Sequence, residues 1–241
     1  MTELLQNPKV LILAILSGIL PAIFWLWFWI KEEENEDHEP LGLIAVSFIF
    51  GGLIVFFAIW LEKYSINFIG NKTWQIITWA VIEELLKFAG VALIIFGNHK
   101  VKKPINYPIF FITIALGFAA FENFLYLLNP LNTSGAIVGM LTGNLRFLGS
   151  TLLHAMASAM IGSAFGLSFY LKKYRVFYIF GGIICAIVLH SVFNFFIMKG
   201  SGENFLSVFG FLWVVTIINI LIFEKLKRMS TYVEISNNNI C

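Results

Sequence analysis

The sequence is short of charge and of cysteine. Only 12% of its 241 residues are charged, about half the fraction that is usual in soluble domains. Apolar residues make up 59% of the chain, too many for one soluble core, so lipid must cover part of them. The two cysteines lack metal-ligand spacing and no HExxH motif occurs. No basic stripe indicates nucleic-acid binding.

The chain instead has long apolar runs, each near the ~20 residues that a helix needs to cross roughly 30 Å of hydrocarbon. We expect an all-α integral membrane protein, a bundle of about seven transmembrane helices with an intramembrane polar site, in one domain over residues 1–229. The spans are predicted at 10–30, 41–61, 76–96, 109–128, 145–171, 176–198 and 205–223. The segment 230–241, rich in Asn and Ser, is expected to be a disordered tail.

Lysine and arginine in the loops predict the orientation, because cytoplasmic loops are enriched in both. One side of the membrane holds Lys31, Lys100, Lys102, Lys103, Lys172, Lys173, Arg175, Lys225, Lys227 and Arg228, and the other holds Lys9, Lys63, Lys72, Arg146 and Lys199. The richer side should be cytoplasmic. We therefore expect a multi-pass protein of the cell membrane, with its N-terminus outside and its C-terminus in the cytoplasm.

Ionisable residues interrupt four of the apolar runs, and each costs roughly 2.5–3.5 kcal/mol on insertion scales. They are Glu83, with Glu84 beside it, Glu122, His154 and His190. Counted from the span ends at about 1.5 Å per residue, the four positions lie roughly 9–14 Å below the same membrane surface. Scattered charges would not agree in depth, so we expect one shared site, in the outer half of the membrane if the orientation holds.

Helical spacing adds neighbours to this site. Lys87 follows Glu83 by four residues and Glu84 by three, so its ammonium can neutralise either carboxylate. The other polar residues expected around the site are Asn123, Tyr126, Arg146 and Asn194.

Two kinds of hydrolytic site fit this set of residues. A carboxylate that is desolvated among apolar helices is a competent base for water near neutral pH, with histidines and an asparagine as oxyanion donors. Alternatively, two histidines and a glutamate make an open zinc site and leave another glutamate as base. The expected cofactor is therefore either none or one zinc ion. A cysteine nucleophile is disfavoured, because Cys185 lies about one and a half turns before His190.

The order of the motifs resembles the PrsW family of intramembrane proteases, relatives of the CAAX prenyl endopeptidases and the bacteriocin-processing proteins. The motifs are EExxK at 83–87, GFAxxEN and a tyrosine at 117–126, an arginine and a histidine at 146 and 154, and HxxxN at 190–194. The resemblance implies an endopeptidase, of metallo or glutamic type, that cuts membrane-anchored proteins such as anti-sigma factors near the extracytoplasmic face. Its partners would be a single-pass membrane protein substrate and the lipid bilayer, with no nucleic acid.

We predict that Glu83 is the base that activates water and that Glu84 supports it. Lys87 would hold both carboxylates in place. His190 and Asn194 would stabilise the oxyanion.

Glu122 and His154 are expected to position the water or, together with His190, to bind the metal. Two other functions stay open. A proton-coupled transporter could use the same buried carboxylates, although the inverted repeats typical of transporters are not evident. A protein with immunity or scaffold function could also keep the protease fold without turnover.

Overall fold

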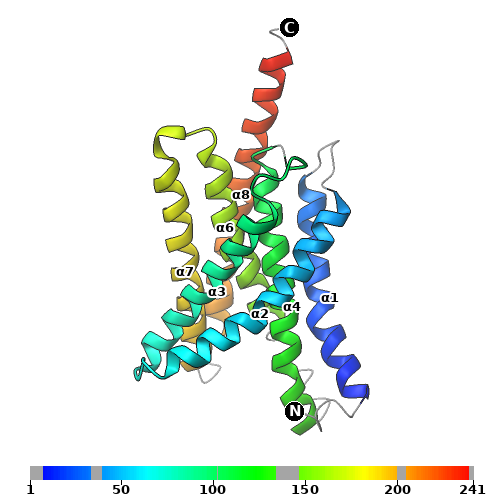
Figure 1. Ribbon diagram of the computed structural model, residues 1–241, viewed down its shortest axis with the longest axis vertical. Helices are drawn as coiled ribbons and strands as arrows, with labels where there is room; N and C mark the ends of the chain where they lie inside the picture. The colour runs from blue at the N-terminus through cyan, green and yellow to red at the C-terminus, as the bar shows by residue number, and fades with distance from the viewer. Residues whose placement is uncertain (1–7, 34–39, 102, 134–146, 200–204, 239–241) are drawn as a thin grey trace.

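The computed structural model describes residues 8–33, 40–101, 103–133, 147–199 and 205–238. Within these ranges the chain is helical and contains no strand. The elements are α1 (Pro8–Glu33), α2 (Leu41–Ile66), α3 (Lys72–Ile94), α4 (Asn106–Thr133), η2 (Phe147–Thr151), α6 (Leu152–Ser168), η3 (Lys172–Tyr174), α7 (Arg175–Lys199) and α8 (Phe205–Asn238). Figure 1 shows them as one helical bundle, which confirms the predicted all-α fold.

Six of these helices, all the α-helices but α3, are long and apolar enough to cross a membrane. A helix suits the bilayer because its backbone groups hydrogen-bond within the segment. α3 is 23 residues long, but it carries Glu83, Glu84 and Lys87 near its centre and is therefore less apolar. Each of the seven predicted spans coincides with one of the α-helices.

The helix ends differ from the predicted spans in several places, and α4 ends at Thr133 instead of residue 128. α2 continues to Ile66 instead of ending at residue 61. The predicted span 145–171 is divided, because a π-helical turn, η2, precedes α6 and α6 ends at Ser168. α3 begins earlier than expected, since the Asn71 side chain accepts hydrogen bonds from the backbone N–H groups of Thr73 at 2.9 Å and Trp74 at 3.3 Å and caps the helix there.

The C-terminal tail also differs from the prediction. We expected disorder from Ser230 onward, whereas α8 continues to Asn238. Adding a residue to an existing helix gains one hydrogen bond for each residue fixed. The segment contains neither proline nor glycine, so nothing in its sequence forces the helix to stop at Ser230. In Figure 1 this end of α8 extends beyond the other helices.

α4 lies at the centre of the bundle, against α1, α2 and α6. It approaches α2 very closely through two glycines. A Cβ on Gly51 of α2 would overlap the carbonyl oxygen of Ile114, and a Cβ on Gly117 of α4 would overlap that of Phe48. Small residues allow membrane helices to pack backbone against backbone in this way.

α6 approaches α4 from another side, also through small residues. A Cβ on Gly162 would lie 2.6 Å from the Cα of Pro108, and one on Gly166 would lie 2.6 Å from the carbonyl oxygen of Pro104. α6 and α4 are the most buried of the apolar helices.

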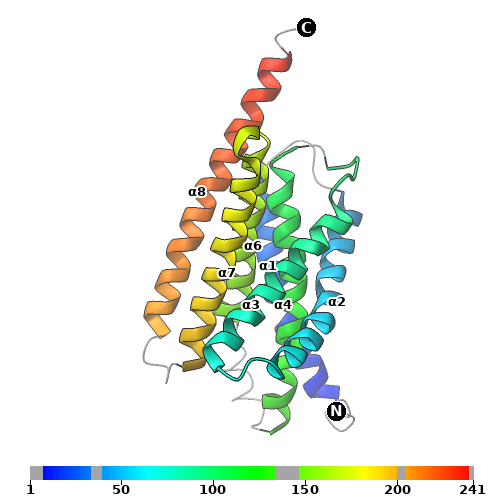
Figure 2. The ribbon, with the colours of Figure 1, turned by 60° about the vertical axis from the view of Figure 1, so that its left-hand side comes forward.

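α2 and α3 form a hairpin that crosses the bundle obliquely, as Figures 1 and 2 both show. This crossing brings the middle of α3 against α4, α6 and α7. The four helices on which the sequence placed the ionisable residues are therefore neighbours.

Candidate active site

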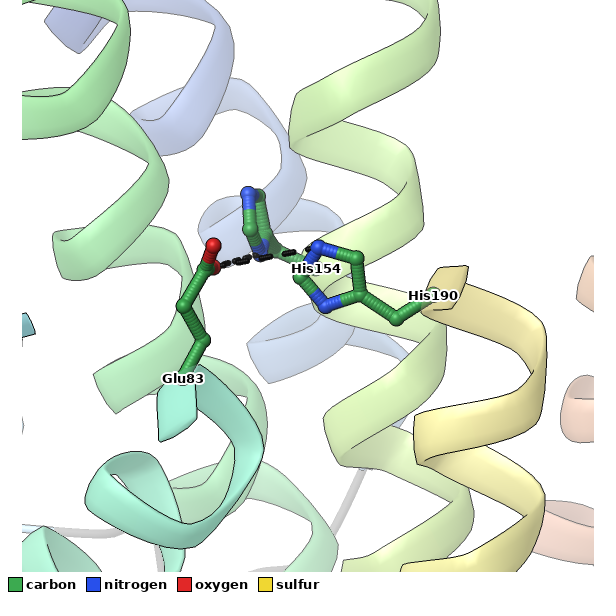
Figure 3. Close-up of side chains that lie close together, drawn as sticks. All are labelled: Glu83, His154 and His190. Carbon is green, nitrogen blue, oxygen red and sulfur yellow. Dashed lines mark ion pairs between the residues drawn. The ribbon is translucent and has the colours of Figure 1, made fainter. Parts of the chain in front are cut away.

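Glu83, His154 and His190 meet at the junction of α3, α6 and α7 (Figure 3). All three side chains are buried. Glu83 Oε2 lies 3.8 Å from His154 Nδ1 and 3.8 Å from His190 Nε2. The two imidazole rings meet edge to face, with their centroids 5.0 Å apart. One carboxylate oxygen thus faces one nitrogen of each histidine.

The opposite nitrogen of each histidine lies on a second carboxylate. His154 Nε2 is 2.8 Å from Glu122 Oε2, and His190 Nδ1 is 2.8 Å from Glu84 Oε1. A carboxylate only accepts hydrogen bonds, so these two nitrogens carry the hydrogens. In the neutral rings, His190 Nε2 therefore presents a lone pair on the side of Glu83, whereas the lone pair of His154 Nδ1 accepts a hydrogen bond from Lys87.

Lys87 is fully buried beside this cluster. Its ammonium donates to Glu84 Oε1 at 2.7 Å and to His154 Nδ1 at 2.8 Å, and it lies 3.7 Å from Glu83 Oε2. It also lies over the ring of Phe118, 4.6 Å from the ring centroid. Among the residues that the structure describes, Lys87 is the one lysine or arginine in contact with Glu83 or Glu84. It holds both carboxylates, as the sequence spacing predicted.

The remaining predicted residues lie at different distances from this cluster. Glu122 is at its edge, with 28% of its side chain exposed, and Tyr126, one turn further along α4, is 48% exposed. Asn123 is buried and donates to Thr151 Oγ1 of η2 at 2.9 Å. Asn194 is half-buried one turn beyond His190, and no hydrogen bond joins it to the cluster within the described ranges. Arg146 lies outside the described residues.

The same residues carry the motifs of a known protease family. The family described as "PrsW family intramembrane metalloprotease" matches residues 39–222. The chain belongs to the PrsW family. This membership makes it a protease of the membrane, since the family is one of intramembrane proteases.

Three PrsW relatives illustrate how far the similarity extends. The Protease PrsW of Geobacillus kaustophilus is 26% identical over 186 residues, which are 76% of this chain and 78% of that protein. The Protease PrsW of Bacillus subtilis is 26% identical over 205 residues, with 82% and 89% covered. That of Halalkalibacterium halodurans is 24% identical over 224 residues, with 88% and 97% covered. No solved structure matches the chain significantly.

The description of the PrsW family implies a metal, and the donor set fits one. Glu83 Oε2 is buried without a hydrogen-bond partner, which is costly unless another group fills the space in front of it. Donors on a tetrahedral zinc ion lie roughly 3.3 Å apart, given bonds of about 2.0–2.1 Å, so the 3.8 Å separations from the two histidines need only a small closure. The outer carboxylates are the partners that metal-binding histidines usually have.

The structure changes which carboxylate belongs to this candidate metal site. We expected Glu122, His154 and His190 to bind the metal. In the structure, Glu83 is the carboxylate whose oxygen lies close to both rings. Glu122 lies on the outer nitrogen of His154 instead. Sequence spacing could not separate these two positions, because both carboxylates reach the same ring from opposite sides.

One residue beside the candidate site was not predicted from the sequence. Glu62, near the end of α2, lies close enough to Glu83, Glu122 and Lys87 to interact with all three electrostatically. The predicted second span ends at residue 61, which leaves Glu62 outside it. An acidic residue at the end of an apolar run was the only signal available for it.

Proposed function

We propose that this PrsW family member cleaves single-pass membrane proteins near the extracytoplasmic face, with membrane-anchored anti-sigma factors as one such class of substrate. The observation that carries the proposal is the buried Glu83 carboxylate, whose Oε2 accepts no hydrogen bond and lies 3.8 Å from a ring nitrogen of each of two histidines. Such a group accepts a proton from a water molecule readily, because no other hydrogen bond has to break first. The excess of loop lysines and arginines on the opposite side of the membrane supports the outer location.

In a mechanism that uses water alone, Glu83 takes a proton from the water while the water oxygen adds to the scissile carbonyl carbon. The C–N bond then breaks, and Glu83 returns the proton to the leaving amine. The oxyanion needs a hydrogen-bond donor. His190 presents a lone pair to the centre, so we assign this role to the Lys87 ammonium, 3.7 Å from Glu83 Oε2, in place of the role first predicted for His190 and Asn194.

In a mechanism that uses a metal, Glu83, His154 and His190 would hold the ion. Bound zinc would supply Lewis-acid polarisation of the water and of the scissile carbonyl. Glu83 would then no longer be free to take the proton. Glu122 lies at the edge of the cluster, with its side chain 28% exposed, and it would take over as base.

Cleavage in a cell that expresses both proteins tests the proposed function. Wild type, Glu83→Gln and His190→Ala would each be expressed beside a tagged single-pass protein, and the fragment measured by immunoblot. We expect both variants to lose at least about 10²-fold in cleavage, the usual loss when a general base is removed. Glu224→Gln is the matched control, because Arg228, with 82% of its side chain exposed, is the one ion-pair partner of Glu224 among the described residues. Undiminished cleavage by both site variants would refute the proposal.

The metal content of the purified protein separates the two mechanisms. If Glu83 is a ligand, wild type should contain one zinc per chain by mass spectrometry, and Glu83→Gln should lose most of it. A chelator should then abolish cleavage by the wild type. If Glu83 acts on water alone, both proteins should be free of stoichiometric zinc and the chelator should have no effect.

A further inference from the structure

A second concave surface lies far from the candidate active site, at the turn between α6 and α7. This turn stands at the upper left in Figure 1, and beside it is a hollow of about 470 Å³. Its lining contains the cations Lys172, Lys173 and Arg175, the apolar side chains Val176, Phe177 and Phe180, and Tyr174. The cations form one half and the apolar side chains the other.

The cationic half of the hollow is not neutralised by the protein. All three cations are exposed, and none of them forms an ion pair within the part of the chain that the structure describes. The Arg175 guanidinium is held in place by aromatic rings, 5.3 Å from the centroid of Phe169 and 5.8 Å from that of Phe165. A positive cluster without an ion-pair partner among the described residues attracts an anion.

The apolar half continues directly from the cations along the first turns of α7. Val176, Phe177 and Phe180 are 68%, 77% and 61% exposed. They belong to a helix that is apolar enough to cross a membrane, and the three cations stand at the start of that candidate span. The cations therefore lie at the level of lipid headgroups, and the apolar side chains lie beside the acyl chains.

We propose that this hollow binds an anionic phospholipid, with the phosphate on the three cations and one acyl chain along the apolar side chains. A neutral lipid would leave the positive cluster without a counter-charge, and a soluble anion would leave the apolar half uncovered. Basic pockets between membrane helices are known to bind anionic headgroups. The proposal does not depend on the proteolytic activity.

Native mass spectrometry of the full-length protein in detergent tests this site. The protein would be titrated with phosphatidylglycerol, with phosphatidylcholine and with glycerophosphoglycerol, which has the headgroup without acyl chains. We expect the phosphatidylglycerol complex to form at the lowest concentration. The Lys172→Gln/Lys173→Gln variant should bind this lipid about thirtyfold more weakly, since each lysine near an anionic surface contributes roughly a factor of five.

The matched control is Lys100→Gln/Lys225→Gln, which removes two exposed lysines predicted at the same membrane surface but outside the hollow. This control should bind phosphatidylglycerol like the wild type. Phe177→Ala keeps every charge and should weaken only the binding of the lipid with acyl chains. Equal binding of phosphatidylcholine, equal binding of glycerophosphoglycerol, or an equal loss in the control would each overturn the proposal.

Discussion

Replacing Lys87 with methionine should destabilise the protein strongly. Methionine has nearly the length and shape of the lysine stem, so the packing against Phe118 is largely kept. The ammonium is lost, together with its contacts to Glu84 at 2.7 Å and to His154 at 2.8 Å. Glu84, which is fully buried, would then have no cation beside it among the described residues.

The size of the effect follows from this burial. Removing one partner of a buried ion pair costs about 3–5 kcal/mol, because the other charge stays buried and unpaired. Whole domains are stable by only about 5–15 kcal/mol, so the variant should lose a large fraction of its stability. Adding Glu84→Gln removes the stranded charge while its amide oxygen still accepts from His190. The double variant should therefore be about 2 kcal/mol more stable than Lys87→Met alone.

The free energy of unfolding can be measured in dodecyl maltoside micelles titrated with sodium dodecyl sulfate, with helix content followed by circular dichroism. Lys63→Met is the control, since it makes the same substitution at an exposed lysine near the end of α2. It should leave stability nearly unchanged. The reasoning fails if Lys87→Met is as stable as this control, or if Glu84→Gln gives no recovery in the double variant.

Variants of Glu122, Glu62 and Gly117 test contacts at the edge of the site and between α2 and α4. Glu122→Ala removes the acceptor that holds His154 Nε2 and should lower cleavage about 10–100-fold, as expected for an outer partner of a site histidine. Glu122→Gln should recover part of this activity in the cleavage assay if orientation alone is needed. Glu62→Ala should lower cleavage because Glu83 and Glu122 lose a neighbouring carboxyl that interacts with both, and unchanged turnover and substrate affinity would contradict that role. Gly117→Ala should unfold the protein or destabilise it by several kcal/mol, because the new methyl group would overlap a backbone carbonyl of α2. Gly181→Ala, where a Cβ has open space, should unfold like the wild type in the same detergent titration.

The neighbourhood of the site could be predicted from the sequence because ionisable side chains are costly in apolar helices. Glu83, Glu122, His154 and His190 need polar partners, which the hydrocarbon does not supply, so equal depth on four spans indicates that they meet. The structure brings these four together. Depth alone does not tell how each helix is rotated about its own axis, however. It therefore did not distinguish Glu83, which faces both histidines, from Glu122, which lies behind His154.

Glu62 shows a different limit of sequence reasoning. The predicted second span, 41–61, is already long enough to cross the hydrocarbon, so residue 62 falls outside it. α2 has 26 residues and crosses the bundle obliquely (Figure 1). A tilted helix needs more residues to cross the same thickness, so a residue that hydropathy assigns to the surface can lie within the site. Tilt depends on packing against neighbours such as α4, which hydropathy does not describe.

His154 also provides a test that separates the two mechanisms without measuring activity. Its Nδ1 accepts a hydrogen bond from Lys87, and a lone pair that is used in this way cannot bind a metal at the same time. If the site holds zinc, Lys87 must release this nitrogen, so Lys87→Met should contain at least as much zinc per folded chain as the wild type. A variant that is less stable but no poorer in zinc would support the metal site. If zinc is absent from both proteins, the bond between Lys87 and His154 belongs to the working state of the site, and Glu83 acts on water directly.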